Sequence, residues 1–243
     1  MSSLEHIVDR QIKKWEMERK QREEKIRKQE EIFVQPVVTI SRQWGSRGSY
    51  LAKRLAEILN YNLVDREIID YIVKNSGVRR KLVESLDEKT RSEIGLWMEG
   101  ILEGRYVDKG EYFTHLLRCI KVIGEHGATV IVGRGANFAL GLRYGFHLRV
   151  VAPEEIRMQY LVKYENVSPE QAKEAIKKSD EERKSFIRSF YHADIDDPQY
   201  YDMVINSAYV DVEDTIFFIR EAIKAKAEKL KWLERRGELK KTP

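Results

Sequence analysis

The pattern of hydrophobic positions predicts a strand, a polar turn and a helix over residues 37–59. Residues 37–40 form a short β-branched run with few charges, which is typical of a buried strand. Residues 41–49 are mostly small or polar. Beyond this turn the apolar residues fall on one helical face: Leu51, Ala52, Leu55, Ala56 and Leu59. Asn60 suits the helix end because Asn tolerates the left-handed conformation.

Four further apolar runs predict the other strands of a sheet, at residues 61–65, 129–133, 147–152 and 202–206. The connecting segments have mostly helical patterns: 66–127, 153–191 and a closing amphipathic helix at 211–236. Strands that alternate with helices predict an α/β fold with a five-stranded parallel sheet covered on both faces. Ligands of such sheets bind at the carboxyl ends of the strands. We therefore expect three segments to meet at one edge: 41–49, Asp65 and Gly133-Arg134.

Residues 4–32 are dense in charge, contain no Gly or Pro, and predict one long helix. Its apolar positions form a thin stripe: Val8, Ile12, Trp15 and Ile26. Arg19 and Arg22 interrupt what would be a coiled-coil seam. Two interpretations remain open. The helix packs on its own domain through Trp15, or it docks a second copy of the chain or another protein partner.

Composition and charge exclude several classes of protein. The net charge is +4, and residues 220–243 hold nine Lys or Arg against four Asp or Glu, so the remaining body is close to neutral. That balance disfavours nucleic-acid binding except through the basic tail. The single cysteine, Cys119, lies in an apolar helical pattern and is expected in the core. No run is long enough to span a membrane and no signal peptide is evident, so we expect a cytoplasmic, reducing location.

The turn at residues 41–49 has the composition of an anion site. A strand, a Gly/Ser-rich turn and a helix start direct main-chain N–H groups and the positive helix end at a bound anion. Gly45 and Gly48 let the backbone approach a phosphate closely. The standard pattern is G-x-x-x-x-G-K-[ST], whereas here the glycines are too close and no Lys follows the second. The turn alone therefore indicates either a phosphate cradle or a plain strand-to-helix connection.

Residues 40–49, Ile-Ser-Arg-Gln-Trp-Gly-Ser-Arg-Gly-Ser, followed by Ala-Lys-Arg-Leu-Ala-Glu at 52–57, resemble the opening of the cytidylate kinase-like family. That family belongs to the P-loop nucleoside monophosphate kinases. Similar segments follow in the same order at 64–69, 130–136, 152–157 and 180–183. The resemblance covers residues 37–222, with 70–126 matched only by length and helical character.

The resemblance implies transfer of a phosphoryl group from ATP, with Mg²⁺, to a nucleoside monophosphate such as CMP or dCMP. It implies a three-layer P-loop kinase fold within a domain over residues 36–236. This domain would carry a helical acceptor-binding insertion at about 66–127 and a helical lid at about 157–195. A charged N-terminal helix, 1–35, and a basic tail, 237–243, would flank it.

The resemblance also implies roles for single residues. The ATP phosphates would be held by Arg42, Gly45, Ser46, Arg47, Gly48 and Ser49, and the Ser49 hydroxyl would meet Mg²⁺. Asp65 and Arg134 would bind the acceptor nucleotide. The catalytic arginines would be Arg47, Arg157 and Arg183, the last two clamping phosphates as the lid closes.

Plain structural interpretations stand beside these roles. Asp65 suits the cap of a helix that starts at Arg66. Arg157 and Arg183 would be surface ion pairs, and Arg188 could take the place of Arg183. Arg42 would pair with a carboxylate.

Three departures from the family pattern leave a second function open. Arg47-Gly48-Ser49 replaces the Lys-bearing end of the loop, and Arg is not equivalent to Lys. Val132 supplies no acidic partner for Mg²⁺, and Gly135 stands where cytidylate kinases proper carry an Asp. The alternative is a nucleotide-binding regulatory or scaffold protein with little turnover, in which the N-terminal helix is the output element.

Overall fold

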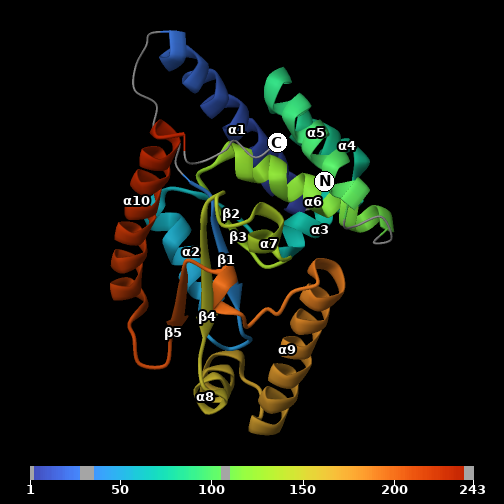
Figure 1. Ribbon diagram of the computed structural model, residues 1–243. Coiled ribbons are helices and arrows are strands. Elements are labelled where there is room, and N and C mark those ends of the chain that lie inside the picture. The colour runs from blue at the N-terminus through green and yellow to red at the C-terminus, as the bar shows by residue number, and fades with distance from the viewer. Residues whose placement is uncertain (1–2, 28–35, 105–109, 238–243) are drawn as a thin grey trace.

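The computed structural model describes residues 3–27, 36–104 and 110–237. At its centre lies a parallel sheet with the strand order β2-β3-β1-β4-β5 (Figure 1). In chain order the strands are β1 (Val38–Arg42), β2 (Asn62–Val64), β3 (Thr129–Val132), β4 (Phe146–Val151) and β5 (Met203–Asn206). All neighbouring strands are parallel, so the predicted α/β fold with a five-stranded parallel sheet is confirmed.

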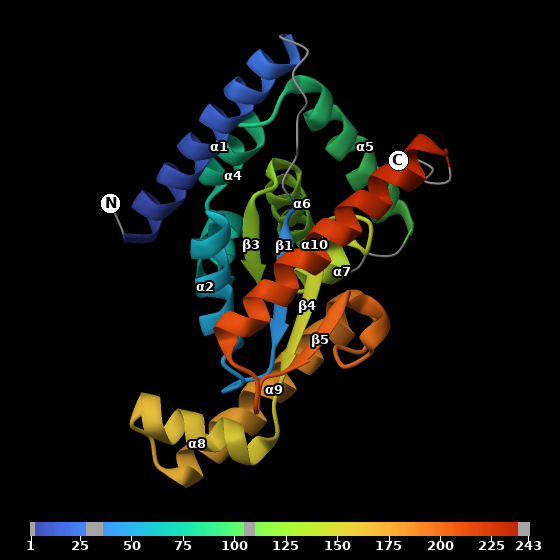
Figure 2. The same cartoon turned by 90° about the vertical axis from the view of Figure 1, so that its left-hand side faces the viewer.

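Helices connect the strands and cover both faces of the sheet (Figures 1 and 2). They are α1 (Ser3–Arg27), α2 (Gly48–Leu59), α3 (Arg66–Lys74), α4 (Ser76–Glu84), α5 (Glu88–Gly104), α6 (Gly110–His126), α7 (Ala136–Leu140), α8 (Glu154–Glu165), α9 (Pro169–Tyr191), the 3₁₀ turn η1 (Pro198–Tyr200) and α10 (Val212–Arg235). The charged stretch predicted at 153–191 is two helices. Asn166 ends α8 in the left-handed conformation, and a capping box between Ser168 and Gln171 starts α9.

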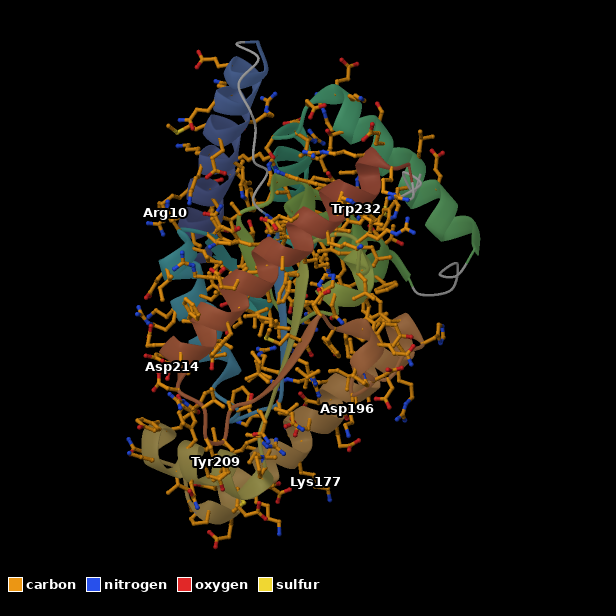
Figure 3. The ribbon with its side chains drawn as sticks, turned by 60° about the vertical axis from the view of Figure 1, so that its left-hand side comes forward. Arg10, Lys177, Asp196, Tyr209, Asp214 and Trp232 are labelled. Carbon is orange, nitrogen blue, oxygen red and sulfur yellow. The ribbon has the colours of Figure 1, made fainter. Side chains whose placement is uncertain are left out.

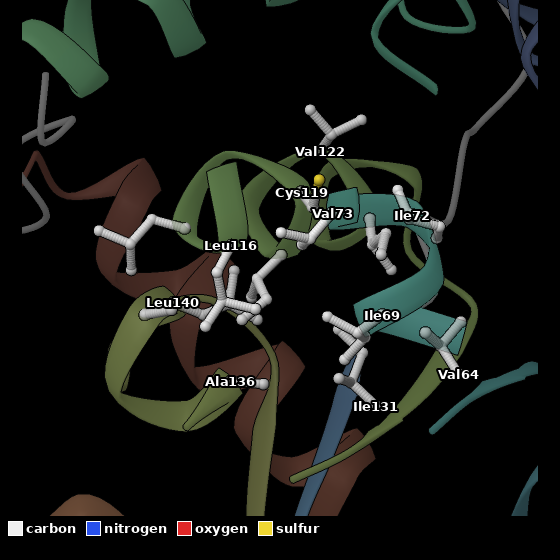
Figure 4. Close-up of a cluster of buried hydrophobic side chains, with 14 of the residues drawn as sticks. Val64, Ile69, Ile72, Val73, Leu116, Cys119, Val122, Ile131, Ala136 and Leu140 are labelled. Carbon is white, nitrogen blue, oxygen red and sulfur yellow. The ribbon is translucent and has the colours of Figure 1, made fainter. Parts of the chain in front are cut away.

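Alternation along the strands separates two cores. Even-numbered residues of β1 and β4, such as Ile40 and Leu148, pack against α2 and α10. The opposite face is covered by α3, α6 and α7, where Val64 and Ile131 meet an apolar cluster that includes Cys119 (Figure 4). Burial raises the pKa of the Cys119 thiol to about 12, which agrees with the predicted core position.

Two buried polar pairs join β1 to β4 on this second face. Thr39 Oγ1 lies 2.7 Å from His147 Nδ1, and Arg149 Nη1 donates to Ser41 Oγ at 2.8 Å. The His147 Nε2 atom lies 2.9 Å from the Gly141 carbonyl, which accepts only. A neutral ring with its proton on Nε2 therefore satisfies both partners. These pairs place polar groups on this face of β1 and β4.

Helix α1 packs on its own domain. Val8, Ile12 and Trp15 are buried in the core that α3 and α6 form, and the Trp15 ring stacks on His126 with 4.8 Å between ring centroids. The apolar stripe of the described part is thereby used inside the chain, so a partner would meet the charged face of α1. Among the described helices, none combines the length and the apolar character needed to cross a bilayer.

We predict that Trp15→Ala lowers the free energy of unfolding by about 3–5 kcal/mol, because it opens a cavity in a fully buried site. Chemical denaturation measures this change. Met17→Ala is the matched control on the same helix, since Met17 is 63% exposed and its loss should cost less than about 0.5 kcal/mol. Equal stability of the two variants would show that α1 does not pack as described.

The second prediction concerns pH. Burial lowers the pKa of His147 from 6.5 to about 4. As the pH falls, the unfolded chain therefore binds a proton at this residue at a higher pH than the folded chain does. Stability from this group is therefore complete above about pH 6.5 and is lost as the pH falls toward 4, by about 3 kcal/mol in full. Unfolding free energies from about pH 7 to about pH 4.5 should fall less steeply in His147→Gln than in the wild type. Parallel pH profiles would contradict the prediction.

Candidate functional site

The loop between β1 and α2 sets the register of the site. Helix α2 begins at Gly48, and the residue before it, Arg47, holds a left-handed φ of 60°. The second glycine of G-x-x-x-x-G-K-[ST] occupies this place, directly before the helix. When the pattern is aligned at that position, it covers residues 42–49, here called the glycine loop. Arg42 and Arg47 then occupy the two glycine positions of the pattern. Gly48 occupies the Lys position of the pattern, and Ser49 occupies its Ser/Thr position.

The glycine loop is closely packed and leaves a helix start open. Ser46 is buried, its Oγ donates to the Gln43 carbonyl at 2.9 Å, and Ser207 Oγ donates to the Ser46 carbonyl at 2.7 Å. A side chain at Gly45 would come within 2.9 Å of the Arg157 carbonyl. The first bond within α2 is donated by the Leu51 N–H. The N–H groups before it have no partner within the helix, which is the arrangement of an anion-binding helix start.

Helices α8 and α9 (here called the lid) lie against the glycine loop. Asp180 accepts hydrogen bonds from the Trp44 N–H at 3.1 Å and from Arg157 Nη1 at 2.6 Å. Arg157 also donates to the Trp44 carbonyl at 3.2 Å. The Trp44 side chain packs on the small core of the lid, formed by Leu161, Ala172 and Ile176. Trp44 is thus a packing residue in this structure, and Asp180 joins the lid to the loop.

A cavity of about 860 Å³ (here called the main cavity) opens at the carboxyl edge of the sheet, lined among others by Arg42, Ser49, Asp65, Asp70, Arg134 and Arg183. The predicted meeting of residues 41–49, Asp65 and Gly133-Arg134 at one edge therefore occurs. Arg183 donates to the Arg42 carbonyl at 2.8 Å, and its guanidinium lies over the Trp44 ring. Burial and the neighbouring Arg42 lower the pKa of Arg183 to about 10, so the group remains charged at neutral pH.

A smaller cavity of about 290 Å³ lies between the loop and α9, and Arg42, Arg149, Arg157 and Arg183 all reach it. Arg149 is buried in β4 and donates to Asp196 Oδ1 at 2.6 Å. Lys177 and Asp196 lie on this lid side of the molecule (Figure 3). The smaller cavity is therefore cationic, with seven Lys or Arg against three Asp or Glu, whereas the main cavity is lined by four Arg and four Asp or Glu.

On the far side of the main cavity Arg134 is held by Asp70. The Arg134 guanidinium makes two hydrogen bonds to the Asp70 carboxylate, and Tyr112 donates to the same group at 2.8 Å. A side chain at Gly135 would overlap the Tyr191 ring, and Gly135 has a positive φ. An Asp does not fit there. Asp70, from α3, instead supplies a carboxylate beside the Gly-Arg pair.

The structure places the other predicted residues as follows. Asp65 caps α3 by accepting from the Ile68 N–H at 3.0 Å, and it also lines the main cavity. The Arg47 guanidinium lies over the Tyr50 ring, 5.9 Å from its centroid, and does not line either described cavity. Arg157 is 6% exposed and committed to Asp180.

Three further residues of the site were not predicted: Asp70, Arg149 and Asp180. Each reaches the site from a helix or strand whose own pattern is ordinary, so no local motif marks it. The segment 180–183 resembles the family, but the role that this resemblance implies belongs to Arg183 and not to Asp180.

The residues fit a magnesium ion that binds as a complex with a nucleotide, and not one that is coordinated by protein side chains alone. Among the described residues no group of three or more His, Cys, Asp or Glu forms a metal site. Ser49 is exposed at the start of α2 and its Oγ lies 3.4 Å from Arg42 Nε. Mg²⁺ keeps several waters and commonly takes one or two protein ligands beside substrate phosphates. Ser49 is placed to supply one such ligand.

Comparisons with known proteins agree with this geometry. A stretch of 105 residues is 31% identical to a cytidylate kinase of Methanocaldococcus jannaschii and covers 42% of this chain and 58% of that enzyme. A stretch of 190 residues is 26% identical to a cytidylate kinase of Methanothrix thermoacetophila and covers 78% of this chain and 98% of that enzyme. An uncharacterized protein from Eubacterium ventriosum has the same fold, with a TM-score of 0.55 and 21% identity. The match covers 78% of this chain and 99% of that protein.

The family model called cytidylate kinase-like matches residues 37–209, which include the glycine loop, the main cavity and the lid. These residues make up more than half of the chain. The chain therefore belongs to the cytidylate kinase-like family.

Proposed function

We propose that this protein transfers the terminal phosphoryl group of ATP to a nucleoside monophosphate. The observation that carries the proposal is the main cavity, which joins the open start of α2 to the guanidinium groups of several arginines. Its lining holds four arginines, Arg42, Arg66, Arg134 and Arg183, and four carboxylates, Asp65, Glu67, Asp70 and Glu182. The guanidinium groups suit phosphate-bearing ligands, since Arg binds phosphate through planar, two-pronged hydrogen bonds.

In the proposed reaction an oxygen of the acceptor monophosphate attacks the γ-phosphorus of ATP. A new phosphorus–oxygen bond forms, the bond to the oxygen bridging the β- and γ-phosphates breaks, and ADP leaves with that electron pair. The protein positions both nucleotides and neutralises charge on the transferring group. The N–H groups at the start of α2 and the guanidinium of Arg183 serve the donor. Mg²⁺ bound with ATP would neutralise further phosphate charge near Ser49.

Closure of the lid would exclude water from the transfer. The bonds from Asp180 to Trp44 and Arg157 hold the lid against the glycine loop, so Arg157 acts on the loop backbone in this state. Its proposed contact with phosphate would require it to leave Asp180. Arg183 needs no such exchange, because its guanidinium already lines the main cavity.

Arg134 and Asp70 form the proposed acceptor side. An acceptor phosphate would compete with Asp70 for the Arg134 guanidinium, and the freed carboxylate would then be available to the base or the sugar. CMP and dCMP are the first acceptors to test, because the curated relatives are cytidylate kinases. The carboxylate that replaces the family Asp comes from a different element, so the preferred base need not be cytosine.

The proposed function predicts ADP formation that requires both Mg²⁺ and an added monophosphate. A coupled assay of ADP release with CMP, dCMP, UMP, AMP and GMP measures it, and a thermal-shift screen of the same nucleotides reports binding. The absence of acceptor-dependent ADP across the panel would overturn the proposal. ATP binding without turnover would instead favour the nucleotide-binding regulatory or scaffold function.

We further predict that Arg134→Met raises KM for the acceptor about 10- to 100-fold, because a charge-assisted phosphate contact is lost. The affinity for ATP should change by less than about threefold. Arg134→Lys keeps the charge without the paired hydrogen bonds, so its KM for the acceptor should lie between those of the wild type and Arg134→Met. Melting temperatures check that each variant is folded. A larger loss of ATP affinity than of acceptor affinity would place Arg134 on the wrong side of the cavity.

A further inference from the structure

We propose that Arg42 takes the place of the phosphate-binding lysine in this chain, through an exchange of side chains between positions 42 and 48. The usual loop has Gly at the first position and Lys at the seventh. This chain has Arg at the first and Gly at the seventh. The inference rests on the proposed function, and it assigns to Arg42 the contact with the β- and γ-phosphates of the donor.

The geometry makes the two side chains mutually exclusive. A Cβ atom at Gly48 would lie 2.6 Å from Arg42 Cβ, closer than packed atoms approach, and 3.2 Å from Arg42 Cγ, which is also tight. The stem of Arg42 thus fills the space into which a side chain at position 48 would extend. Any residue larger than Gly at 48 requires a smaller residue at 42, which is the arrangement of the usual loop.

The end of the Arg42 side chain lies where phosphate charge is expected. Its Nε is 3.4 Å from Ser49 Oγ, at the open start of α2. Its Nη1 lies beside Gly133, where an added Cβ would be only 2.8 Å away. The guanidinium therefore spans from the glycine loop to the turn after β3, inside the main cavity. Both glycines leave room for it.

The charge environment agrees with a ligand-binding cation. Burial lowers the pKa of Arg42, and Asp65 offsets part of this effect. No ion pair to Arg42 within 4.0 Å is found among the described residues, whereas Arg134, Arg149 and Arg157 each have a carboxylate partner. Arg47, the other arginine of the loop, points to Tyr50 instead. Arg42 is thus the loop cation whose charge is left for an anion to balance.

The exchange of space is tested first, without nucleotide. Gly48→Lys should lower the melting temperature, and Arg42→Gly in the same chain should recover most of that loss. The approach to Val150 Cβ, 3.1 Å, leaves the double variant with a small deficit. Gly77→Lys is the control, because nothing lies within 4 Å of a Cβ there. If Arg42→Gly recovers none of the stability lost in Gly48→Lys, the exchange is refuted.

The role in binding is tested by titration with ATP and with ADP, in the presence and absence of Mg²⁺. Arg42→Met keeps the stem beside Gly48 and removes the guanidinium, and it should weaken ATP binding about 10- to 100-fold. The double variant Arg42→Gly/Gly48→Lys should bind within about tenfold of the wild type, because Lys restores the charge. Lys53→Ala, an exposed cation on α2, should bind as the wild type does.

The outcomes separate the two proposals. Wild-type ATP affinity in a folded Arg42→Met variant would overturn the role of Arg42 while leaving the kinase function standing. A double variant that is folded but binds no better than Arg42→Met would do the same. If the wild-type chain itself binds no nucleoside triphosphate, the proposed function fails, and the assignment of Arg42 fails with it.

Discussion

The mutual repulsion of closely spaced arginines is the constraint on which the arrangement of the site depends. Carboxylates from separate elements offset it: Asp70 for Arg134, Asp196 for Arg149, and Asp180 for Arg157. Like charges in a partly desolvated space raise the free energy of the folded chain unless they are paired. The remaining positive charge near the glycine loop makes a polyanionic ligand a favourable part of the folded structure.

One of these pairs also couples the lid to the loop. Asp180 contacts the Trp44 backbone and the Arg157 guanidinium together, so movement of α9 away from the loop breaks both bonds at once. The small core around Trp44 would open in the same step. Lid position and loop conformation are therefore expected to change as a unit rather than independently.

The sequence predicted the fold well and the site in part. Strand positions follow from the short β-branched runs, and the meeting of 41–49, Asp65 and Arg134 follows from strand direction alone. The loop register was not predictable, because it depends on a left-handed φ at Arg47, a conformation uncommon for a non-glycine residue. Asp70 and Asp180 were missed because their partners are 64 and 23 residues away, and their local patterns are those of ordinary helices.

The close approach of Arg42 and Gly48 has a consequence for how such loops diverge. Starting from a Gly–Lys loop, a first change to Arg at position 42 overfills the space, while a first change to Gly at position 48 leaves it empty and uncharged. Either single step is expected to weaken packing or phosphate binding until the second is made, so we expect the two positions to change together. Families with the Gly–Lys pair and families with the Arg–Gly pair would then share one loop geometry but differ in sequence motif. A search for a motif that requires the lysine would miss relatives of the second kind.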